Sequence, residues 1–424
     1  MHIDQASKDQ LKTELNVLER AYLELQKQEL SLDLTRGKPG KDQVALSNPL
    51  DGILEGHYLS ANGTDVRNYG GLDGLAEARE FFGSLLGCNA EETLIGGNSS
   101  LALMYFTLEV AVHHGLRGPN SAWSRHKTNK FICPVPGYDR HFTVCEHLGI
   151  EMLTVDMLDT GPDMDAVEAL LAADDSIRGM WCVPRFSNPT GCTYSDETVD
   201  RIAGLGAKAG EDFLVMWDNA YVVHTLSPSA PALASIRQCC EKHGTCDSVV
   251  QFGSTSKITF AGAGLAYLAS SKNILGALKA QLAFQTIGPD KVNQLRHLRF
   301  LKDRETLESH MAKHAELIKP RFDAVLQTLD AELAGTGMGE WTHPLGGYFI
   351  SFQSRPGLAA EIVGLAADIG VKLTPAGATY PYGKDPQDAN IRLAPTFPSL
   401  SEVQATVKAF VVCVKLASVR QALR

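Results

Sequence analysis

Lys257 stands among small residues at the end of an apolar segment, in the sequence GSTSKITFAGAG. Most lysines in a chain are protonated and solvated, and an SxSK sequence alone is a weak indication of anything else. Burial and nearby cationic groups lower the pKa of a lysine, however, and the neutral amine can then form a Schiff base. Lys257 is therefore a candidate for covalent chemistry with a carbonyl compound.

Other polar side chains could assist this lysine by holding an electron-accepting ring. Asp218, in FLVMWDNAY, could pair with a protonated pyridine nitrogen and so keep the ring able to accept electrons. A carboxylate that caps a turn is the common alternative. Tyr221 and Asn188, the latter in SNPTG, could both donate to a phenolate oxygen of the ring. A half-buried tyrosine and ordinary turn chemistry are the corresponding plain interpretations.

The sequence also suggests sites for two anions. The segment GGNSS at 96–100 opens a predicted helix, and the backbone N–H groups at a helix start favour a phosphate. Ser99, Ser100 and Ser254 could add hydroxyl donors, although Asn-Ser-Ser is also a routine helix cap. Arg392, in NIRLAPTF, suits a substrate carboxylate because a guanidinium binds carboxylates in a bidentate manner. A surface arginine is the alternative.

Short apolar runs alternate with helical stretches from about residue 90 onwards, which indicates a parallel sheet covered on both faces. The expected strands lie within residues 93–97, 130–137, 179–191, 213–221 and 248–257. Ligands bind at the carboxyl ends of such strands. The polar residues that close these runs are therefore site candidates as a set, namely Asn98, Ser99, Ser100, Tyr138, Asn188, Asp218, Tyr221, Ser254 and Lys257.

The two ends of the chain predict a second unit. Residues 8–30 have the apolar spacing of an amphipathic helix, and residues 290–330 carry a long charged helical pattern. Predicted strands at 345–352, 371–377 and 390–397 precede a helix from about Ser401. We expect residues 1–50 and 311–424 to form a small domain and residues 51–310 a large one.

Composition narrows the class of protein. The formal net charge of -10 disfavours binding to nucleic acid. No apolar run approaches the ~20 residues that span a bilayer, and the polar N-terminus lacks the apolar region of a signal peptide, so a cytoplasmic enzyme is expected. Nine cysteines without a CxxC pair favour a reducing compartment. The cluster Cys239, Cys240, His243 and Cys246 matches no standard zinc spacing, so free thiols and no metal are expected.

The order of eight motifs resembles class I aminotransferases, of fold type I among pyridoxal-phosphate-dependent enzymes. These motifs are LTRGKP, NYGGLDGLAEAR, GGNSS, PGY, NPTG, DNAY, STSK and IRL. The phrases TRGKPG, YGGLDGL, GGNSSL, SKITFAGAG and ATYPYGKDP are similar to a divergent bacterial subgroup of aspartate aminotransferases. The resemblance implies an α/β fold: a large domain with a mainly parallel seven-stranded sheet between helices, and a smaller α+β domain. It also implies pyridoxal 5'-phosphate as cofactor.

The resemblance assigns roles by position. Lys257 would be the Schiff-base lysine and proton shuttle, Asp218 would hold the pyridine nitrogen, and Asn188 and Tyr221 the ring oxygen. Tyr138 would stack on the ring, and the phosphate would be held by Asn98, Ser99, Ser100 and Ser254. Tyr69 would reach the phosphate of a neighbouring subunit, which implies a homodimer with shared sites. Arg392 would bind the substrate α-carboxylate, with Gly37 close to the substrate.

One departure and one open choice remain. The family usually places an arginine for the phosphate shortly after the lysine, whereas FAGAGLAYL contains none. We expect L-aspartate and 2-oxoglutarate as substrates with ping-pong kinetics, because Arg36, Lys38 and Arg185 could pair with a second carboxylate. These cations could equally be solvated or paired with acids. Other possibilities are another amino donor such as alanine or an aromatic amino acid, a lyase or decarboxylase, and a non-catalytic cofactor-binding regulator. The last would need more residues before TRGKPG for a DNA-binding domain.

Overall fold

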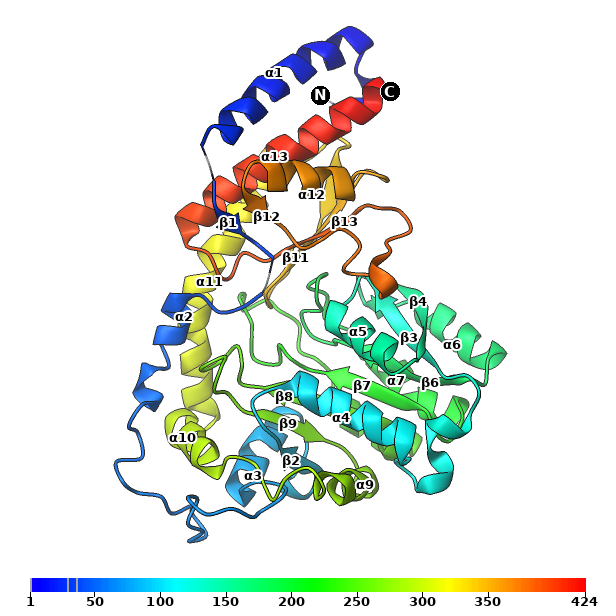
Figure 1. The fold of residues 1–424 in the computed structure, drawn as a ribbon, viewed down its shortest axis with the longest axis vertical. Coiled ribbons are helices and arrows are strands. Elements are labelled where there is room, and N and C mark those ends of the chain that lie inside the picture. Colours follow the sequence, from blue (N-terminus) through cyan, green and yellow to red (C-terminus); the bar gives the residue numbers. More distant parts are fainter. Residues whose placement is uncertain (1, 29, 36) are drawn as a thin grey trace.

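A central β-sheet forms the larger part of the computed structural model, which describes residues 2–28, 30–35 and 37–424 (Figure 1). Its strand order is β2-β9-β8-β7-β6-β3-β4-β5. The strands are β2 (Thr93–Ile95), β3 (Lys130–Val135), β4 (Glu151–Leu158), β5 (Gly161–Pro162), β6 (Ile177–Cys182), β7 (Leu214–Asp218), β8 (Val249–Ser254) and β9 (Ala266–Ala269). The predicted α/β fold is confirmed, and the two-residue β5 extends the expected seven strands to eight at one edge.

Strand direction explains why polar residues gather at one end of this sheet. β8, β7, β6, β3 and β4 are parallel to one another, whereas β9 runs antiparallel to both β2 and β8 and β5 runs antiparallel to β4. β6 and β7 are buried along their whole length, as expected for parallel strands covered on both faces. The carboxyl ends of the parallel strands therefore share one edge, where Asp218 and Ser254 are the last residues of β7 and β8.

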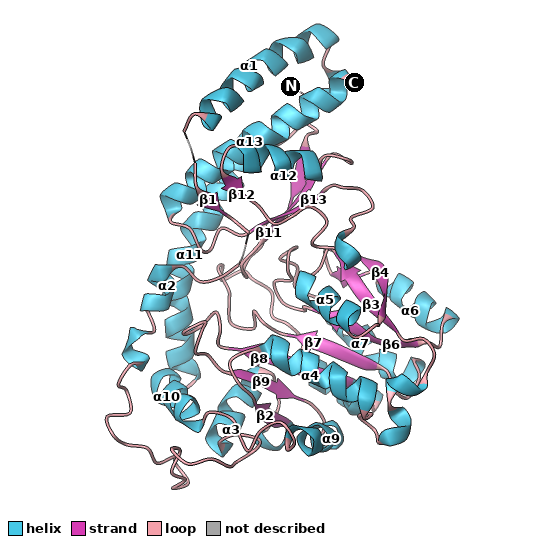
Figure 2. Ribbon diagram, in the orientation of Figure 1, coloured by secondary structure: helices cyan, strands magenta, loops and turns pink. Residues whose placement is uncertain are grey.

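Helices cover both faces of the sheet (Figure 2). Alternate residues of β7 point to opposite faces: Leu214 and Met216 pack with one set of helices, Val215 and Trp217 with the other. The first set is α4 (Ser100–His113), α5 (Asp139–His147) and α9 (Lys272–Leu282). The second set is α6 (Met164–Ala173), α7 (Asp196–Lys208) and α8 (Ile236–His243). α3 (Ala76–Leu85) and α10 (Lys291–Leu301) pack in a further apolar cluster beside β2 and β9.

A second unit joins the two ends of the chain. β11 (Ile350–Ser354) pairs antiparallel with β10 (Gly339–Trp341) and β13 (Asn390–Leu393), and β1 (Leu32–Asp33) pairs parallel with β12 (Val371–Lys372). Its helices are α1 (Lys8–Gln26), α2 (Lys41–Ala45), α11 (Arg304–Leu333), α12 (Ala359–Asp368) and α13 (Leu400–Leu423). α1 lies along α13, so the two termini are near each other (Figure 1).

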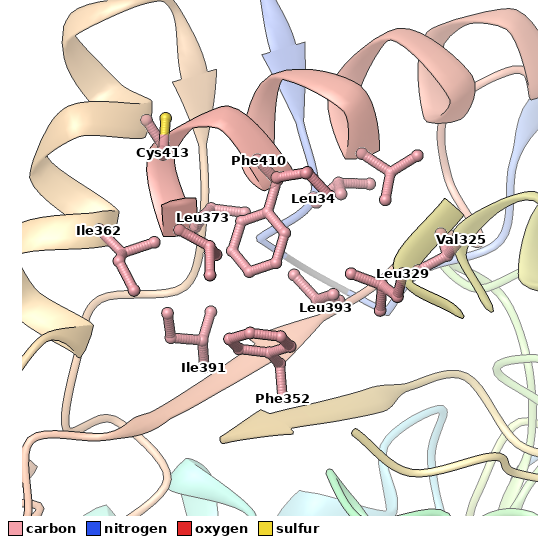
Figure 3. Close-up of a cluster of buried hydrophobic side chains, with 14 of the residues drawn as sticks. Leu34, Val325, Leu329, Phe352, Ile362, Leu373, Ile391, Leu393, Phe410 and Cys413 are labelled. Carbon is pink, nitrogen blue, oxygen red and sulfur yellow. The ribbon is translucent and has the colours of Figure 1, made fainter. Parts of the chain in front are cut away.

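The apolar core of this unit explains the joining of the ends. Phe352 of β11 and Phe410 of α13 meet edge to face, with ring centroids 5.1 Å apart and planes at 84°. Leu393 and Leu329 point toward them, and Leu34 reaches the same core from the N-terminal segment (Figure 3). We keep the domain boundaries near residues 50 and 310 as a proposal. At the second of these positions α11 runs on through residue 310 without interruption.

Some elements differ from the expectation. The helix predicted over 290–330 is two helices, because Lys302 between α10 and α11 has a positive φ of 52°. The predicted strand at 371–377 is only two residues long. Among the described residues, the helices include none that is both long and apolar enough to cross a membrane.

Candidate active site

A cavity of about 770 Å³ collects most of the predicted site residues. Its lining includes Gly37, Lys38, Ser100, Tyr138, Asn188, Asp218, Tyr221, Ser254, Lys257 and Arg392. These residues come from the carboxyl ends of β7 and β8 and the segments that follow them, from the segments after β3 and β6, and from the start of α4. The second unit adds β13 and the segment between β1 and α2. The chain therefore brings together residues that span more than 350 positions of sequence.

Lys257 follows β8 and faces two aromatic rings. Its Nζ lies 5.1 Å from the ring centroid of Tyr221 and 5.8 Å from that of Tyr348. Burial lowers the pKa of the Lys257 amine, while the charge of Asp218 acts in the opposite direction. The fraction of neutral, nucleophilic amine is therefore larger than in a solvated lysine.

Asp218 is a buried carboxylate of which only one oxygen has a hydrogen-bond partner among the described residues. Its Oδ2 lies 3.1 Å from Nε2 of His141, whereas its Oδ1 is buried and has no partner among the residues that the structure describes. A buried, half-paired carboxylate is costly unless a further donor or cation meets it. The free oxygen thus fits a ligand that carries a protonated nitrogen.

His141 contacts Asp218 at the candidate site, although the sequence did not single it out. Its ring stacks on Trp181 with centroids 4.0 Å apart and planes at 5°, so both its position and its orientation toward Asp218 are fixed. Trp181 in turn donates from Nε1 to Sγ of Cys145 at 3.2 Å. The available signal was a histidine on the apolar face of the helix that begins after PGY, a pattern that many core histidines share.

Two tyrosines of the cavity remain neutral donors. Burial raises the pKa of Tyr138 to about 12 and that of Tyr221 well above its usual value. Tyr138 immediately precedes α5, and its ring meets the ring of His141 edge to face, with centroids 4.9 Å apart. Both phenols can thus hydrogen-bond to an anionic oxygen throughout the neutral pH range.

Arg392 and Asn188 contact each other in the wall of the cavity. Nη1 of Arg392 donates to Oδ1 of Asp139 at 2.9 Å and to Oδ1 of Asn188 at 3.3 Å. Because the Asn188 oxygen is engaged, its NH₂ group is the side left to donate. Nε of Arg392 is buried without a partner among the described residues. A free donor on a held guanidinium suits a carboxylate ligand.

The side chains predicted to bind a phosphate at the start of α4 fall into two pairs. Ser99 caps α4, since its Oγ accepts from the backbone N–H of Ala102 at 3.2 Å. Asn98 donates from Nδ2 to the carbonyl of Gly262 at 3.0 Å. The side chains of Asn98 and Ser99 are therefore engaged within the chain, whereas Ser100 and Ser254 line the cavity. Asn98 thus holds the FAGAG segment that lacks the usual arginine.

Three further predicted residues lie elsewhere or are not described. Tyr69 is 85% exposed and does not line the cavity. The structure does not bring Arg185 to the cavity, because its guanidinium donates to the carbonyl of Val222 at 2.5 Å and to Thr225 at 3.2 Å. Arg36 lies outside the described residues. Of the three cations predicted for a second carboxylate, Lys38 does line the cavity, with Nζ 3.8 Å from the ring centroid of Phe397.

The cysteines take no part in this cavity. All nine are free, and Cys239 and Cys240 lie buried on α8. Burial raises the pKa of Cys88, Cys240 and Cys413 to about 12. Within the described ranges, groups of three or more His, Cys, Asp or Glu side chains that could hold a metal ion are absent.

Comparison with known proteins agrees with this arrangement. The family model described as aspartate amino-transferase matches residues 6–424. A putative aminotransferase of Mycolicibacterium smegmatis is 44% identical over 422 residues, which cover 99% of this chain and 98% of that protein. An aspartate aminotransferase of Corynebacterium glutamicum is 42% identical over 402 residues, or 95% of this chain and 93% of the relative.

Solved structures give the same result. The crystal structure of an aspartate transaminase from Corynebacterium glutamicum superposes with a TM-score of 0.95 at 40% identity, covering 100% of this chain and 99% of that one. At 22% identity and a TM-score of 0.74, an α-aminoadipate aminotransferase of Thermus thermophilus, complexed with N-(5'-phosphopyridoxyl)-L-leucine, shares the fold; the match covers 97% of this chain and 95% of that one. The chain belongs to the aspartate aminotransferase family and is an aminotransferase.

Proposed function

We propose that this protein is a pyridoxal 5'-phosphate-dependent aminotransferase that moves the amino group of L-aspartate to 2-oxoglutarate by a ping-pong mechanism. One observation carries the proposal: Asp218, whose buried Oδ1 has no partner among the described residues, lines the same cavity as Lys257 and Arg392. That cavity thus combines a group for a pyridine nitrogen, an amine for an aldehyde and a cation for a carboxylate.

The residues present fit the cofactor. Asp218 would hold its ring nitrogen, Tyr221 and the NH₂ group of Asn188 its ring oxygen, and Tyr138 would stack on its ring. Ser100, Ser254 and the start of α4 would hold its phosphate, with Asn98 and Ser99 shaping that helix start. When bound, the cofactor supplies a carbonyl carbon that takes the amino group and a ring that accepts the electron pair of the α-carbon.

Lys257 is the residue that we propose moves the proton. Its Nζ would remove the α-hydrogen of the amino acid and return it on the cofactor side, which is general acid–base catalysis by one amine. The desolvation that lowers the pKa of Lys257 increases the share of the base form at neutral pH. Tyr221, whose ring lies next to Nζ, limits where the amine can move.

Substrate choice is proposed from the cations of the cavity. Arg392 would bind the α-carboxylate and Lys38 the second carboxylate, since a buried unpaired carboxylate is costly. The Corynebacterium relative named aspartate aminotransferase supports this choice. Arg36 stays a candidate from the sequence alone, and the contacts of Arg185 give it no direct role. An aminotransferase for another amino acid is the alternative.

We also propose a homodimer with shared sites. Tyr69 is 85% exposed, and two large apolar side chains, Phe284 and Ile287, are 86% and 64% exposed. Their loops lie together, because a Cβ atom at Gly288 would come within 2.7 Å of the carbonyl oxygen of Gly70. Exposed apolar groups gathered in this way favour burial against a second copy, which would carry Tyr69 toward the partner's phosphate site.

An absorbance experiment tests the proposal. Protein reconstituted with pyridoxal 5'-phosphate should show a coloured band that L-aspartate shifts and 2-oxoglutarate restores. Rates on aspartate, alanine and phenylalanine then separate the dicarboxylate donor from the alternatives, and Lys38→Met should lower the preference for aspartate over alanine. Colourless protein would refute the cofactor, and equal rates on alanine and aspartate would refute the substrate pair. A cofactor-binding regulator would take up the cofactor without turnover.

A further inference from the structure

Two backbone carbonyls at the reactive lysine are held by side chains from distant elements. The turn after β8 is closed by the N–H groups of Ile258 and Thr259, which both donate to the carbonyl of Thr255. The carbonyl of Lys257 receives the hydroxyl of Tyr348 at 3.4 Å and lies 3.2 Å from Nε2 of His224. Buried carbonyls need such partners, so these side chains fix the peptide that carries the Lys257 side chain.

The next carbonyl along the chain, that of Ile258, is contacted by two histidines of α11. Nε2 of His310 and Nε2 of His314 lie 2.7 Å and 3.0 Å from the carbonyl oxygen of Ile258. Both histidines sit one helical turn apart and are buried, with exposed fractions of 7% and 1%. Burial lowers the pKa of His314 to about 4, so its ring is neutral near pH 7.

Gln43 connects these two supports. Its Oε1 accepts the backbone N–H of Gly40 at 3.0 Å, which assigns the two hydrogens of Nε2 to the other side. Nε2 donates to the hydroxyl oxygen of Tyr348 at 2.9 Å and faces Nδ1 of His314 at 3.3 Å. Each contact sets the direction of the next bond. Tyr348 is left to donate to Lys257, and His314, accepting at Nδ1, is left to donate from Nε2 to Ile258.

The position of Gln43 links this network to the cavity wall. Gln43 is fully buried in α2, directly after the segment whose Gly37 and Lys38 line the cavity. Thr396 donates to the carbonyl of Lys38 at 3.0 Å and so holds that segment against the residues that follow β13. One carboxamide thus joins the backbone of the cavity wall to the backbone of the lysine.

We propose that Gln43 is a positioning residue for Lys257, acting through Tyr348 and His314 to fix the lysine backbone relative to the wall formed by residues 37–40. The inference rests on the proposed function, because it treats Lys257 as the reacting amine. Removing the carboxamide leaves the Tyr348 hydroxyl and His314 Nδ1 without their common donor, which lets Tyr348 turn away from Lys257 and the amine move.

The test compares Gln43→Met, which keeps the side-chain length but removes the amide, with Tyr348→Phe and with both changes together. Gln251→Met is the matched control, because Gln251 is also a buried amide but donates to Sγ of Cys88 at 3.2 Å and contacts neither Tyr348 nor His314. Steady-state rates with aspartate are measured on each reconstituted protein. Acetylation of Lys257 by acetic anhydride is measured separately on the cofactor-free full chain, with the modified peptide located by mass spectrometry.

We expect Gln43→Met to lower kcat about tenfold, because the lysine backbone loses its support. Tyr348→Phe leaves the contact of Gln43 with Gly40 in place, so it should lower kcat with KM changed less than about twofold. The double variant should fall no more than about twofold below either single variant, because both break one network. Lys257 should be acetylated about threefold faster in both single variants and at the wild-type rate in Gln251→Met.

Three results would overturn the inference: wild-type kcat in folded Gln43→Met, losses that multiply in the double variant, or unchanged acetylation of Lys257. If Gln43→Met does not fold, acetylation of Tyr348→Phe decides alone, with an unchanged rate counting against the inference. The acetylation measurement needs neither cofactor nor substrate. An inactive wild-type protein would therefore refute the proposed function, while the acetylation rates would still decide whether Gln43 positions Lys257.

Discussion

Gly37 offers a clean steric perturbation of the cavity. A Cβ atom placed there would lie 2.4 Å from Cζ and 2.7 Å from Cε1 of Phe349. Unstrained carbon atoms stay about 3.5–4.0 Å apart, so Gly37→Ala requires the ring to withdraw by roughly 1 Å.

The displaced ring lies against two residues of the site. The guanidinium carbon of Arg392 is 5.0 Å from the Phe349 centroid, and the ring of Tyr221 meets it edge to face at 6.4 Å. Overpacking of this kind costs about 1–3 kcal/mol of stability. A shift of about 1 Å at catalytic groups can cost about 100-fold in rate. We therefore expect Gly37→Ala to lower kcat/KM for aspartate by between about 10- and 100-fold.

Steady-state kinetics and thermal unfolding, with two further variants, check this expectation. Gly276→Ala is the control, because Gly276 lies within α9 with no atom within 4 Å of an added Cβ. It should leave kcat/KM unchanged and raise stability by about 0.5–1 kcal/mol. In a Phe349→Leu background the ring atoms are gone, so adding Gly37→Ala should cost less than about fivefold.

Two outcomes would contradict this steric account. It fails if Gly37→Ala alone keeps kcat/KM within about threefold of the wild type. It also fails if the loss is equally large in the Phe349→Leu background, since the new methyl group would then obstruct the substrate itself and not the ring.

Further predictions concern charge. Asp218→Asn should weaken cofactor binding and lower kcat by about 100-fold or more, because truncating one side of a buried charge pair costs about 2–5 kcal/mol. Fluorescence titration measures the cofactor affinity and steady-state assays measure kcat. Wild-type values of both would contradict this role of Asp218. Arg392→Lys should lower kcat/KM by about 10- to 100-fold, because one or more charge-assisted hydrogen bonds are lost. A change in kcat/KM below about threefold in steady-state assays would argue against Arg392 as the carboxylate site. Burial lowers the pKa of His224 to about 3 and of His297 to about 4, from 6.5. The unfolded chain thus binds more protons below pH 6.5, so the melting temperature should fall between about pH 7 and 4. His297→Gln should flatten that slope, and an unchanged slope would contradict the assignment.

Local patterns were sufficient for most of the large unit. The segments of β7 and β8 begin as apolar runs and end in polar residues, and a parallel sheet brings those ends to one edge. This is why Asp218, Ser254 and Lys257, widely separated in the chain, could be predicted to meet. β9 gave no comparable signal, because its four residues AYLA are too few to show a period, and its antiparallel pairing depends on β2 and β8.

Long-range contacts set the limit of the sequence argument. Gln43 touches His314 and Tyr348 across 271 and 305 positions, and none of the three has a distinctive sequence neighbourhood. For Arg185, by contrast, the sequence suggested a contact with the site that the structure does not contain. Nearness in sequence to Asn188 suggested a shared site, but Phe186 adopts a positive φ of 49°, and the side chain of Arg185 lies against the turn at Val222 and Thr225.

The free cysteines have a practical consequence for labelling. With thiol pKa values near 12 at Cys88, Cys192, Cys240 and Cys413, almost none of these sulfurs is ionised at pH 7, and maleimides react with the thiolate. A cysteine introduced at the 85% exposed Tyr69 would therefore take up a fluorophore ahead of these four thiols. A dye at that position would report directly, through its emission, on whether a second copy of the chain closes over this loop.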